Sequence, residues 1–269
     1  MAQPIAVITA GGTREPLDEV RHLTNLATGA LPAAIGEQLL ARGWQVEYIL
    51  GPGALRPGSL RSDLDALADD WRARFAELEL RAADLHRRLA PGKLHIHPVE
   101  TAAEMAMMLG EVCLRAQPAL VVCAAAVADY APKLHVGKIS SRQGPNGAAA
   151  PLQLLLEPTP KAIDRVRPAA PKARLLGFKL LAGATEAELQ RAAAHLAQRA
   201  DADLVYANDV RTYKTGQRNG LLIGATGEIL ARLDGGSGVA GQVRLAELLV
   251  QAATQDLMGA LNSQADTVP

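Results

Sequence analysis

Aromatic residues and net charge are both scarce in this sequence of 269 residues, and each scarcity argues against a class of protein. Phe, Trp and Tyr make up only 3% of the chain, which disfavours nucleic-acid binding by base stacking on aromatic side chains. The 28 basic residues equal the 28 acidic ones, so no overall field would attract nucleic acid or an anionic membrane. We therefore expect neither partner, and any anionic ligand must be bound by local groups.

Cysteine and long apolar runs are lacking as well. The two cysteines, Cys113 and Cys123, fall in a predicted helix and a predicted buried strand without metal-ligand spacing, as is typical of a reducing compartment. The first apolar run, residues 5–10, stops at two glycines without the features of a signal peptide, and no run reaches membrane-spanning length. We therefore expect a cytoplasmic protein.

What the sequence does contain is a regular alternation of strand and helix patterns. The predicted strands are residues 5–10, 45–50, 94–99, 120–128, 152–156, 173–178 and 203–207, and residues 220–224 and 228–232 predict a C-terminal β-hairpin. The predicted helices are residues 31–42, 102–116, 160–166, 186–199 and 243–257. This alternation predicts a single α/β domain over residues 1–269, with a doubly wound, Rossmann-like and mostly parallel sheet.

Two stretches interrupt the alternation. The first, about residues 58–92, has the composition and periodicity of a helical insert, and its mixed basic and acidic residues indicate a solvated amphipathic surface. Trp71 and Phe75 lie four residues apart and are expected to dock this insert on the body or on a partner subunit. The second, about residues 131–150, lacks periodicity and is rich in Gly, Pro and Lys, so we expect a mobile lid.

A glycine turn follows the first strand, where open α/β sheets bind phosphate-bearing ligands. The dinucleotide spacing G-x-G-x-x-G is absent, and the second strand ends at Gly51 without the acidic residue that would bind a ribose, which disfavours a dehydrogenase. The loop at residues 13–29 offers arginine, asparagine and threonine donors for phosphate and carboxylate oxygens. In it, Asn25 could direct an amide N–H at a developing oxyanion. An ordinary loop with Asx and Ser/Thr turns remains the alternative.

The same residues resemble the phosphopantothenoylcysteine synthetase family, also called phosphopantothenate–cysteine ligase. The resemblance runs from about residue 5 to 250 outside the insert, and it is closest to the stand-alone bacterial type. Its motifs, in family order, are Ile8-Thr-Ala-Gly-Gly-Thr-Arg-Glu-Pro-Leu-Asp18, Val20-Arg-His-Leu-Thr-Asn25, Ala27-Thr-Gly29, Ala124-Ala-Ala-Val-Ala-Asp-Tyr130, Gly137-Lys-Ile-Ser-Ser141, Pro158-Thr-Pro-Lys-Ala-Ile163, Gly177-Phe-Lys-Leu-Leu181 and Ala207-Asn-Asp-Val210.

The resemblance implies ligation of 4′-phosphopantothenate and L-cysteine to phosphopantothenoylcysteine in coenzyme A biosynthesis. A nucleoside triphosphate, CTP rather than ATP, would activate the carboxylate as an acyl-nucleotidyl anhydride, with Mg²⁺ on its phosphates. The family also implies a homodimer that completes the pantothenate site. Departures from the family pattern at Ala30, Pro32, Lys179 and Arg199 leave the choice between CTP and ATP open.

The family's functional residues carry over to positions that match its motifs. The resemblance implies catalytic roles for Asn25, Lys138 and Arg21. It implies nucleotide binding by Gly11, Gly12, Thr13, Ala125, Ala126, Val127, Asp129, Lys138, Pro160, Lys161, Ala162, Ile163, Phe178 and Arg199, and substrate binding by Asn25, Ala27, Thr28, Gly29 and Asn208. No residue is expected to bind a metal as a resident ligand, and His95 and His97 are interpreted as structural or surface residues.

Two other functions stay open from the sequence. Ala30, Arg199 and the insert would fit a relative that binds nucleotide or pantothenate without catalysis. An NAD(P)-dependent Rossmann oxidoreductase rests on fold analogy alone.

Overall fold

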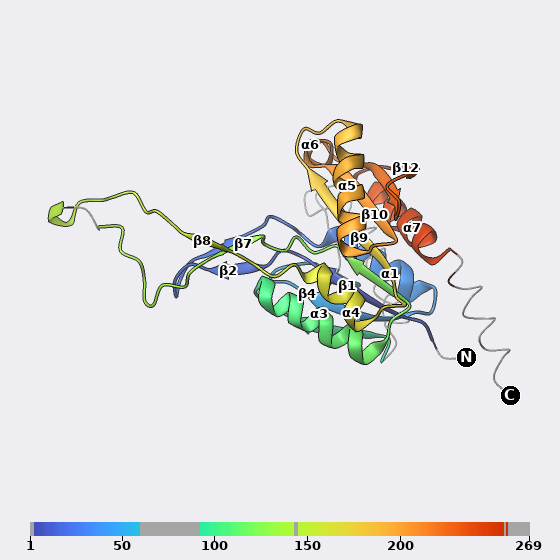
Figure 1. The fold of residues 1–269 in the computed structure, drawn as a ribbon, viewed down its shortest axis with the longest axis horizontal. Helices are drawn as coiled ribbons and strands as arrows, with labels where there is room; N and C mark the ends of the chain where they lie inside the picture. Colours follow the sequence, from blue (N-terminus) through green and yellow to red (C-terminus); the bar gives the residue numbers. More distant parts are fainter. Residues whose placement is uncertain (1–2, 60–91, 143–144, 256, 258–269) are drawn as a thin grey trace, which may run out of the picture.

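The computed structural model describes residues 3–59, 92–142, 145–255 and 257. Its centre is an eight-stranded sheet in the order β12-β11-β10-β9-β6-β1-β4-β5 (Figure 1). The parallel strands are β1 (Ile5–Ala10), β4 (Gln45–Leu50), β5 (Leu94–Pro98), β6 (Leu120–Cys123), β9 (Arg174–Leu181) and β10 (Leu204–Asp209). An antiparallel hairpin, β11 (Gln217–Gly224) and β12 (Ile229–Ser237), extends one edge. The predicted Rossmann-like sheet and C-terminal hairpin are confirmed.

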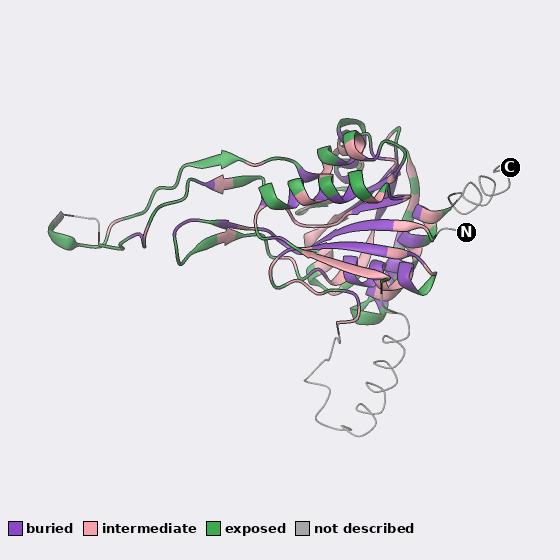
Figure 2. Cartoon of the chain, turned by 90° about the horizontal axis from the view of Figure 1, so that it is seen from below, coloured by how far each residue is buried: buried purple, intermediate pink, exposed green. Residues whose placement is uncertain are grey.

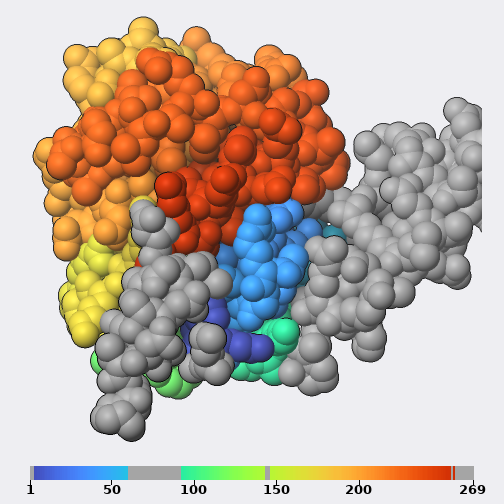
Figure 3. Space-filling model, turned by 90° about the vertical axis from the view of Figure 1, so that its right-hand side faces the viewer, coloured from blue at the N-terminus to red at the C-terminus, as the bar shows by residue number. Residues whose placement is uncertain are grey.

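Helices cover both faces of this sheet because the central strands are apolar on both sides. In β1, Ile8 packs into a cluster with α1 (Ala30–Ala41) and α7 (Gly238–Thr254), and Figure 3 shows these two helices side by side. Val7 faces the opposite way, toward α3 (Ala102–Ala116), η3 (Ala162–Arg165), α4 (Val166–Ala169) and α5 (Glu186–Ala200). A short helix, α6 (Val210–Lys214), follows β10.

Helix ends follow the local sequence signals. The glycine after α1, Gly43, has a φ of 82°, which suits a residue that ends a helix. Thr101 caps α3, and its Oγ1 accepts from the Glu104 N–H at 3.2 Å. The Glu104 carboxylate accepts from the backbone N–H of Glu100 and not from that of Thr101, so only half of a capping box is formed.

Two narrow projections extend from the carboxyl end of the sheet. We call the first, residues 13–25, the arm; it pairs β2 (Arg14–Pro16) with β3 (His22–Thr24). We call the second, residues 130–158, the ribbon; it pairs β7 (Tyr130–Pro132) with β8 (Leu156–Pro158) and carries η2 (Pro145–Gly147) at its tip. Figure 2 shows that the sheet is mostly buried whereas most of the ribbon is exposed.

These projections account for the errors of the sequence prediction. The strand expected at residues 120–128 ends at Cys123, because Ala124–Ala128 turn to pair with the loop after β1. Residues 152–155 are exposed and form no strand, and the short β8 starts only at Leu156. The three-residue strands β2, β3 and β7 are too short to produce a recognisable alternation.

The helical insert expected at residues 58–92 falls almost entirely on residues 60–91, which lie outside the described part of the chain. In the described part, no helix is long and apolar enough to cross a membrane. Both cysteines are free thiols, with Cys113 in α3 and Cys123 at the end of β6. Burial raises the pKa of Cys113 to about 12, so this thiol stays protonated and unreactive at neutral pH.

Candidate active site

The candidate site lies where the winding of the sheet reverses. β1 is flanked by β4 on one side and by β6 on the other, so the segments leaving the carboxyl ends of β1 and β6 diverge there and create a crevice. The glycine turn occupies this point. A Cβ on Gly12 would lie 2.4 Å from the carbonyl oxygen of Asn25, so only glycine permits this close approach of the arm.

The loop after β6 is tied to the loop after β1 by backbone bonds. Ala126 N–H donates to the Gly11 carbonyl at 2.8 Å, and Ala128 N–H donates to Thr13 Oγ1 at 3.0 Å. Gly11, Gly12 and Thr13 are buried, and the threonine hydroxyl is already bonded. The Thr13 side chain is therefore closed to a ligand. These three residues, which the sequence predicted to bind nucleotide, frame the crevice with their backbone.

Asn25 stands at the end of the arm against this loop. Its Nδ2 donates to the carbonyls of Ala126 at 3.1 Å and of Val127 at 3.2 Å. The N–H group therefore faces two backbone carbonyls in this structure, and its contact with an oxyanion stays a prediction. The opposite amide orientation would set Oδ1 against two carbonyl oxygens, which fixes the assignment. Asn25 Oδ1 has no donor among the described residues and is left as an acceptor.

Arg21 is held within the arm. Its guanidinium donates to Asp18 Oδ2 from Nε at 3.0 Å and from Nη2 at 2.5 Å, and Nη2 also donates to the Ile139 carbonyl at 2.7 Å. Its side chain is 42% exposed, and its Nη1 group has no partner within the described part of the chain. Ile139 directly follows Lys138, so the structure brings Arg21 and Lys138 to neighbouring positions.

Lys138 lies in the ribbon beside this anchored residue. It is exposed, and its ammonium contacts no acceptor in the residues that the structure describes. An unpaired cation on a projecting segment, here beside the turn of the arm, is available for an anionic ligand.

Asp129 and Lys161 lie where the ribbon leaves the body and form an ion pair, although 32 positions separate them in sequence. Thr159 N–H donates to the Asp129 carbonyl at 3.0 Å, which fixes the two chain segments side by side. Pro160 is exposed beside them. The next predicted nucleotide residues lie deeper: Ala162 is buried in the core, and Ile163 packs over Gly177 in the middle of β9.

Phe178 is half-buried in β9 and packs edge-to-face on Tyr206, with ring centroids 5.6 Å apart. This contact belongs to the apolar layer under α1 and α7. The ring therefore has a structural role in addition to any contact with a ligand.

Three predicted substrate residues lie at the start of α1. Gly29, with a φ of 70°, precedes the helix, and the Thr28 carbonyl accepts from Leu55 N–H at 2.9 Å. Thr28 is exposed and Ala27 is half-buried. The helix N-terminus that follows them favours an anion because its backbone N–H groups point outward.

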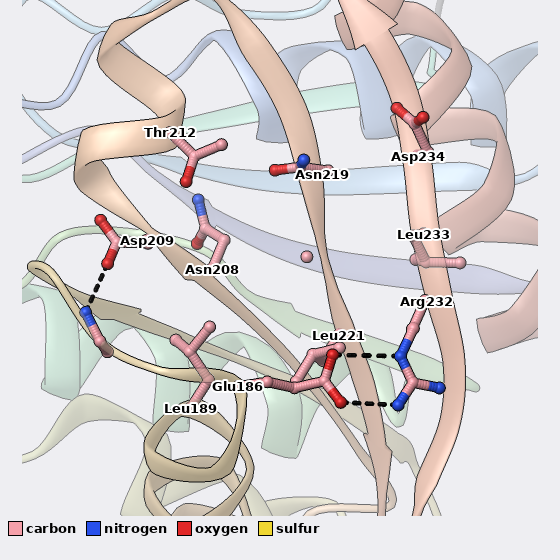
Figure 4. Close-up of a pocket in the computed structure, with 12 residues that line it drawn as sticks. Glu186, Leu189, Asn208, Asp209, Thr212, Asn219, Leu221, Arg232, Leu233 and Asp234 are labelled. Atoms are coloured by element: carbon pink, nitrogen blue, oxygen red, sulfur yellow. Dashed lines mark hydrogen bonds and ion pairs between the residues drawn. The ribbon is translucent and has the colours of Figure 1, made fainter.

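Asn208 does not join this group. It lies at the end of β10, about 14 Å from β1 given the usual spacing of adjacent strands. There it lines a separate hollow of about 360 Å³, in which Thr212 and Asn219 also point inward (Figure 4). Glu186 and Arg232 pair across the rim of this hollow through two hydrogen bonds of 3.1 and 2.6 Å.

Arg199 is also placed apart from the crevice. It lies in the last turn of α5, which leads to the amino end of β10, and it pairs with Asp164 at 2.5 Å. The crevice is at the opposite end of the strands.

Sequence reasoning missed two buried carboxylates and the charged groups around them. One is Asp18 in the arm, which pairs with Arg21. The other is Glu47 in β4, whose carboxylate contacts His95 Nδ1 at 2.8 Å and His97 Nε2 at 2.6 Å. Burial raises the pKa of Glu47, but the two histidine hydrogen bonds outweigh burial and hold that pKa below its usual value. Among the described residues, no group of three or more His, Cys, Asp or Glu is arranged to hold a metal ion.

Comparison with known proteins places the chain in a family. The chain matches the DNA/pantothenate metabolism flavoprotein C-terminal domain family, abbreviated DFP, over residues 1–62 and 65–229. The chain belongs to the DFP family. A curated relative, the coenzyme A biosynthesis bifunctional protein CoaBC of Thermococcus kodakarensis, is 32% identical over 219 residues, or 81% of this chain and 44% of the relative. The chain thus spans less than half the length of that protein.

Solved structures share the fold of this DFP chain. The DNA/pantothenate metabolism flavoprotein from Streptococcus pneumoniae has a TM-score of 0.70 at 24% identity, covering 94% of this chain and 99% of that chain. A Cab2 mutant in complex with phosphopantothenate-cysteine has a TM-score of 0.71 at 23% identity, covering 95% of this chain and 89% of that chain. The resemblance inferred from the motifs is confirmed at the level of the family and the fold.

Proposed function

We propose that this DFP chain ligates 4′-phosphopantothenate to L-cysteine and forms phosphopantothenoylcysteine in coenzyme A biosynthesis. One observation carries the proposal within the family: the Asn25 amide is locked onto the Ala126 and Val127 carbonyls beside the glycine turn. The Cab2 structure, which contains phosphopantothenate-cysteine, supports the same class of substrate.

The proposed reaction has two steps. A carboxylate oxygen of phosphopantothenate attacks the α-phosphorus of a nucleoside triphosphate, and the bond from that phosphorus to the pyrophosphate oxygen breaks. The cysteine amine then attacks the acyl carbon and loses a proton, and the nucleoside monophosphate leaves. The protein contributes position and charge stabilisation to both steps.

The residues of the crevice, the arm and the ribbon would divide these tasks. Asn25 Oδ1, which is left as an acceptor, would receive a hydrogen bond from the cysteine amine and direct its lone pair toward the acyl carbon. The Lys138 ammonium would neutralise charge on the triphosphate, and the Arg21 Nη1 group would bind a phosphate or carboxylate oxygen. Thr28 and the N-terminus of α1 would bind the phosphate end of an anionic substrate.

The nucleotide would lie along the loop after β6, with Ala125, Ala126 and Val127 meeting its base through their backbone. Asp129, Lys161 and Phe178 would complete this subsite. CTP is the proposed donor and ATP the alternative. Magnesium ions in triphosphate sites keep several waters and few protein ligands, and the exposed carboxylate of Asp129 beside Lys161 fits such an ion. Mg²⁺ would therefore arrive with the nucleotide, as part of the substrate.

We also propose that the functional form is a homodimer. Apolar side chains are strongly exposed close to the catalytic groups: Leu26 is 100% exposed, Val136 84% and Leu155 77%. Exposed apolar groups on a projecting segment are typical of a surface that a partner covers. A second copy would bury them and close the site.

The test is product formation followed by mass spectrometry, with phosphopantothenate, cysteine, Mg²⁺ and either CTP or ATP. We expect phosphopantothenoylcysteine with wild type, faster with CTP. Asn25→Asp should lower the rate about 10²-fold or more, because a carboxylate cannot donate to the two carbonyls.

Gln117→Glu is the matched control, because the Gln117 amide also donates to backbone carbonyls, of Leu114 at 2.9 Å, Ala169 at 3.0 Å and Cys113 at 3.4 Å, but at the other end of the sheet. It should keep the wild-type rate. Nucleotide binding without any product from wild type would contradict ligation and favour the non-catalytic relative.

A further inference from the structure

Asp18 is a buried carboxylate that the proposed reaction does not use. Its side chain is fully buried although it lies in the projecting arm. Its Oδ1 accepts from the backbone N–H groups of Val20 at 3.0 Å and Arg21 at 2.8 Å. Its Oδ2 accepts from the Arg21 guanidinium and from Ile139 N–H, the latter at 3.0 Å. The Arg21 hydrogen bond dominates and keeps the pKa of Asp18 well below its usual range, so this group is charged at neutral pH.

The Asp18–Arg21 pair holds both backbone groups of one ribbon residue. Ile139 N–H donates to Asp18, and the Ile139 carbonyl accepts from Arg21 at 2.7 Å. Two side chains thus replace the pair of hydrogen bonds that a neighbouring strand would provide. The Ile139 side chain is buried, whereas Lys138 before it and Ser140 after it are exposed.

We call this hold of Asp18 and Arg21 on Ile139 the clamp. Two further hydrogen bonds join the arm and the ribbon beside it. His135 N–H donates to the Leu17 carbonyl at 3.1 Å, and Gly137 N–H donates to the exposed carboxylate of Glu19 at 3.1 Å. The ribbon is therefore attached to the arm from residue 135 to residue 139. Asn25 lies at the opposite end of the same arm, where the arm joins the body, so one short hairpin holds Asn25 at one end and the backbone next to Lys138 at its turn.

We propose that Asp18 is a positioning residue for Lys138, acting through Arg21 and Ile139. Its charge orients the guanidinium, and the pair fixes Ile139 so that the Lys138 ammonium stays within reach of the triphosphate. This inference rests on the proposed function for the role of Lys138. The clamp itself is a structural claim that can be tested without turnover.

Asp18→Asn disrupts the Asp18–Arg21 clamp on Ile139 and hardly changes the volume of the side chain. The asparagine amide would present N–H groups to donors from Arg21 and Ile139, so at least one buried donor would lose its acceptor. We expect hydrogen exchange at residues 135–139 to become faster. The kcat should fall about 10²-fold, as is typical when a reacting group is misplaced, with a smaller change in KM for phosphopantothenate. Glu19→Gln is the matched control: it removes the charge of an exposed acid in the same turn but keeps an oxygen that can accept from Gly137 N–H, so exchange at residues 135–139 and kcat should stay unchanged.

A double-variant cycle separates positioning from general damage. In a Lys138→Gln background, Asp18→Asn should change kcat by less than about threefold, because residues that act through one another are not additive. A full additional loss of rate in that background would overturn the proposal, and so would unchanged exchange at residues 135–139. If Asp18→Asn does not fold, Asp18→Glu keeps the charge and carries the same cycle, with a smaller loss expected.

The two proposals fail in different ways. If wild type forms no product, the proposed function fails. The exchange measurement still decides the clamp in that case, because faster exchange in Asp18→Asn and not in Glu19→Gln supports it and equal exchange contradicts it.

Discussion

The sheet and the projecting arm are built by different interactions. The sheet is stabilised by apolar side chains on both faces, and residues such as Leu109 in α3 and Val121 in β6 are fully buried. The arm has little apolar surface to bury, and it is held by a buried carboxylate, a guanidinium and backbone groups of distant segments. The comparison suggests that the fold can tolerate changes in the arm, whereas the candidate site cannot.

The largest loss of stability is expected from a substitution in the core beside the sheet, which should leave the candidate site intact. Leu109→Ala leaves a cavity under α3, in the layer that covers one face of the sheet. The free energy of unfolding should fall by about 2–5 kcal/mol, measured by denaturant titration. The kcat of the folded fraction should stay within about twofold of wild type, since most such changes act on stability alone. A loss of kcat in fully folded protein would show that sheet and site are coupled.

The second prediction breaks the site and spares most of the sheet. Gly12→Ala sets a Cβ against the Asn25 carbonyl, so the end of the arm must move. We expect a loss of about 1–3 kcal/mol in the free energy of unfolding, typical of overpacking, together with loss of ligation. Gly43→Ala is a control at a glycine with open space around it, although its positive φ will cost some stability. Activity that survives in Gly12→Ala would contradict the close approach of the arm.

A milder change to the frame is Thr24→Val. The Thr24 hydroxyl donates to the Thr13 carbonyl at 2.8 Å and ties β3 to the glycine turn. Removing it should cost about 1 kcal/mol in thermal unfolding experiments, the usual net value of one hydrogen bond. We expect a larger proportional loss in kcat than in stability, because the arm serves the site more than the fold. If stability falls by about 1 kcal/mol and kcat does not change, the position of the arm at the site does not depend on this hydrogen bond.

The smallest expected effect concerns the polar cluster inside the sheet. Glu47 has a lowered pKa in the folded state, so its charged form stabilises the fold above its ordinary value of 4.5. That contribution is lost as the pH falls through the folded pKa. Wild type should therefore lose more of its melting temperature than Glu47→Gln as the pH drops below about 4.5. Parallel pH profiles would show that the His95 and His97 contacts contribute nothing.

Sequence reasoning recovered the sheet because each long strand carries its own apolar pattern. Residues 5–10 and 45–50 needed no knowledge of their neighbours, and the glycine turn marked the crevice by its place after the first strand. The arm could not be found in this way. Its strands have three residues each, and the contacts of Asp18 with Ile139 and of Asn25 with Ala126 join residues more than 100 positions apart along the chain. The place of Arg199, in the last turn of α5, could not be predicted for a related reason, since a sequence motif does not tell which end of a helix faces the crevice.

The most direct test of the proposed function is a pre-steady-state measurement of pyrophosphate release with phosphopantothenate and CTP in excess and cysteine absent. We predict a burst of about one pyrophosphate per site, followed by continued release once cysteine is added, because the acyl-nucleotidyl intermediate stays bound until the amine attacks it. No release with either CTP or ATP, or release that does not depend on phosphopantothenate, would contradict acyl activation at this site.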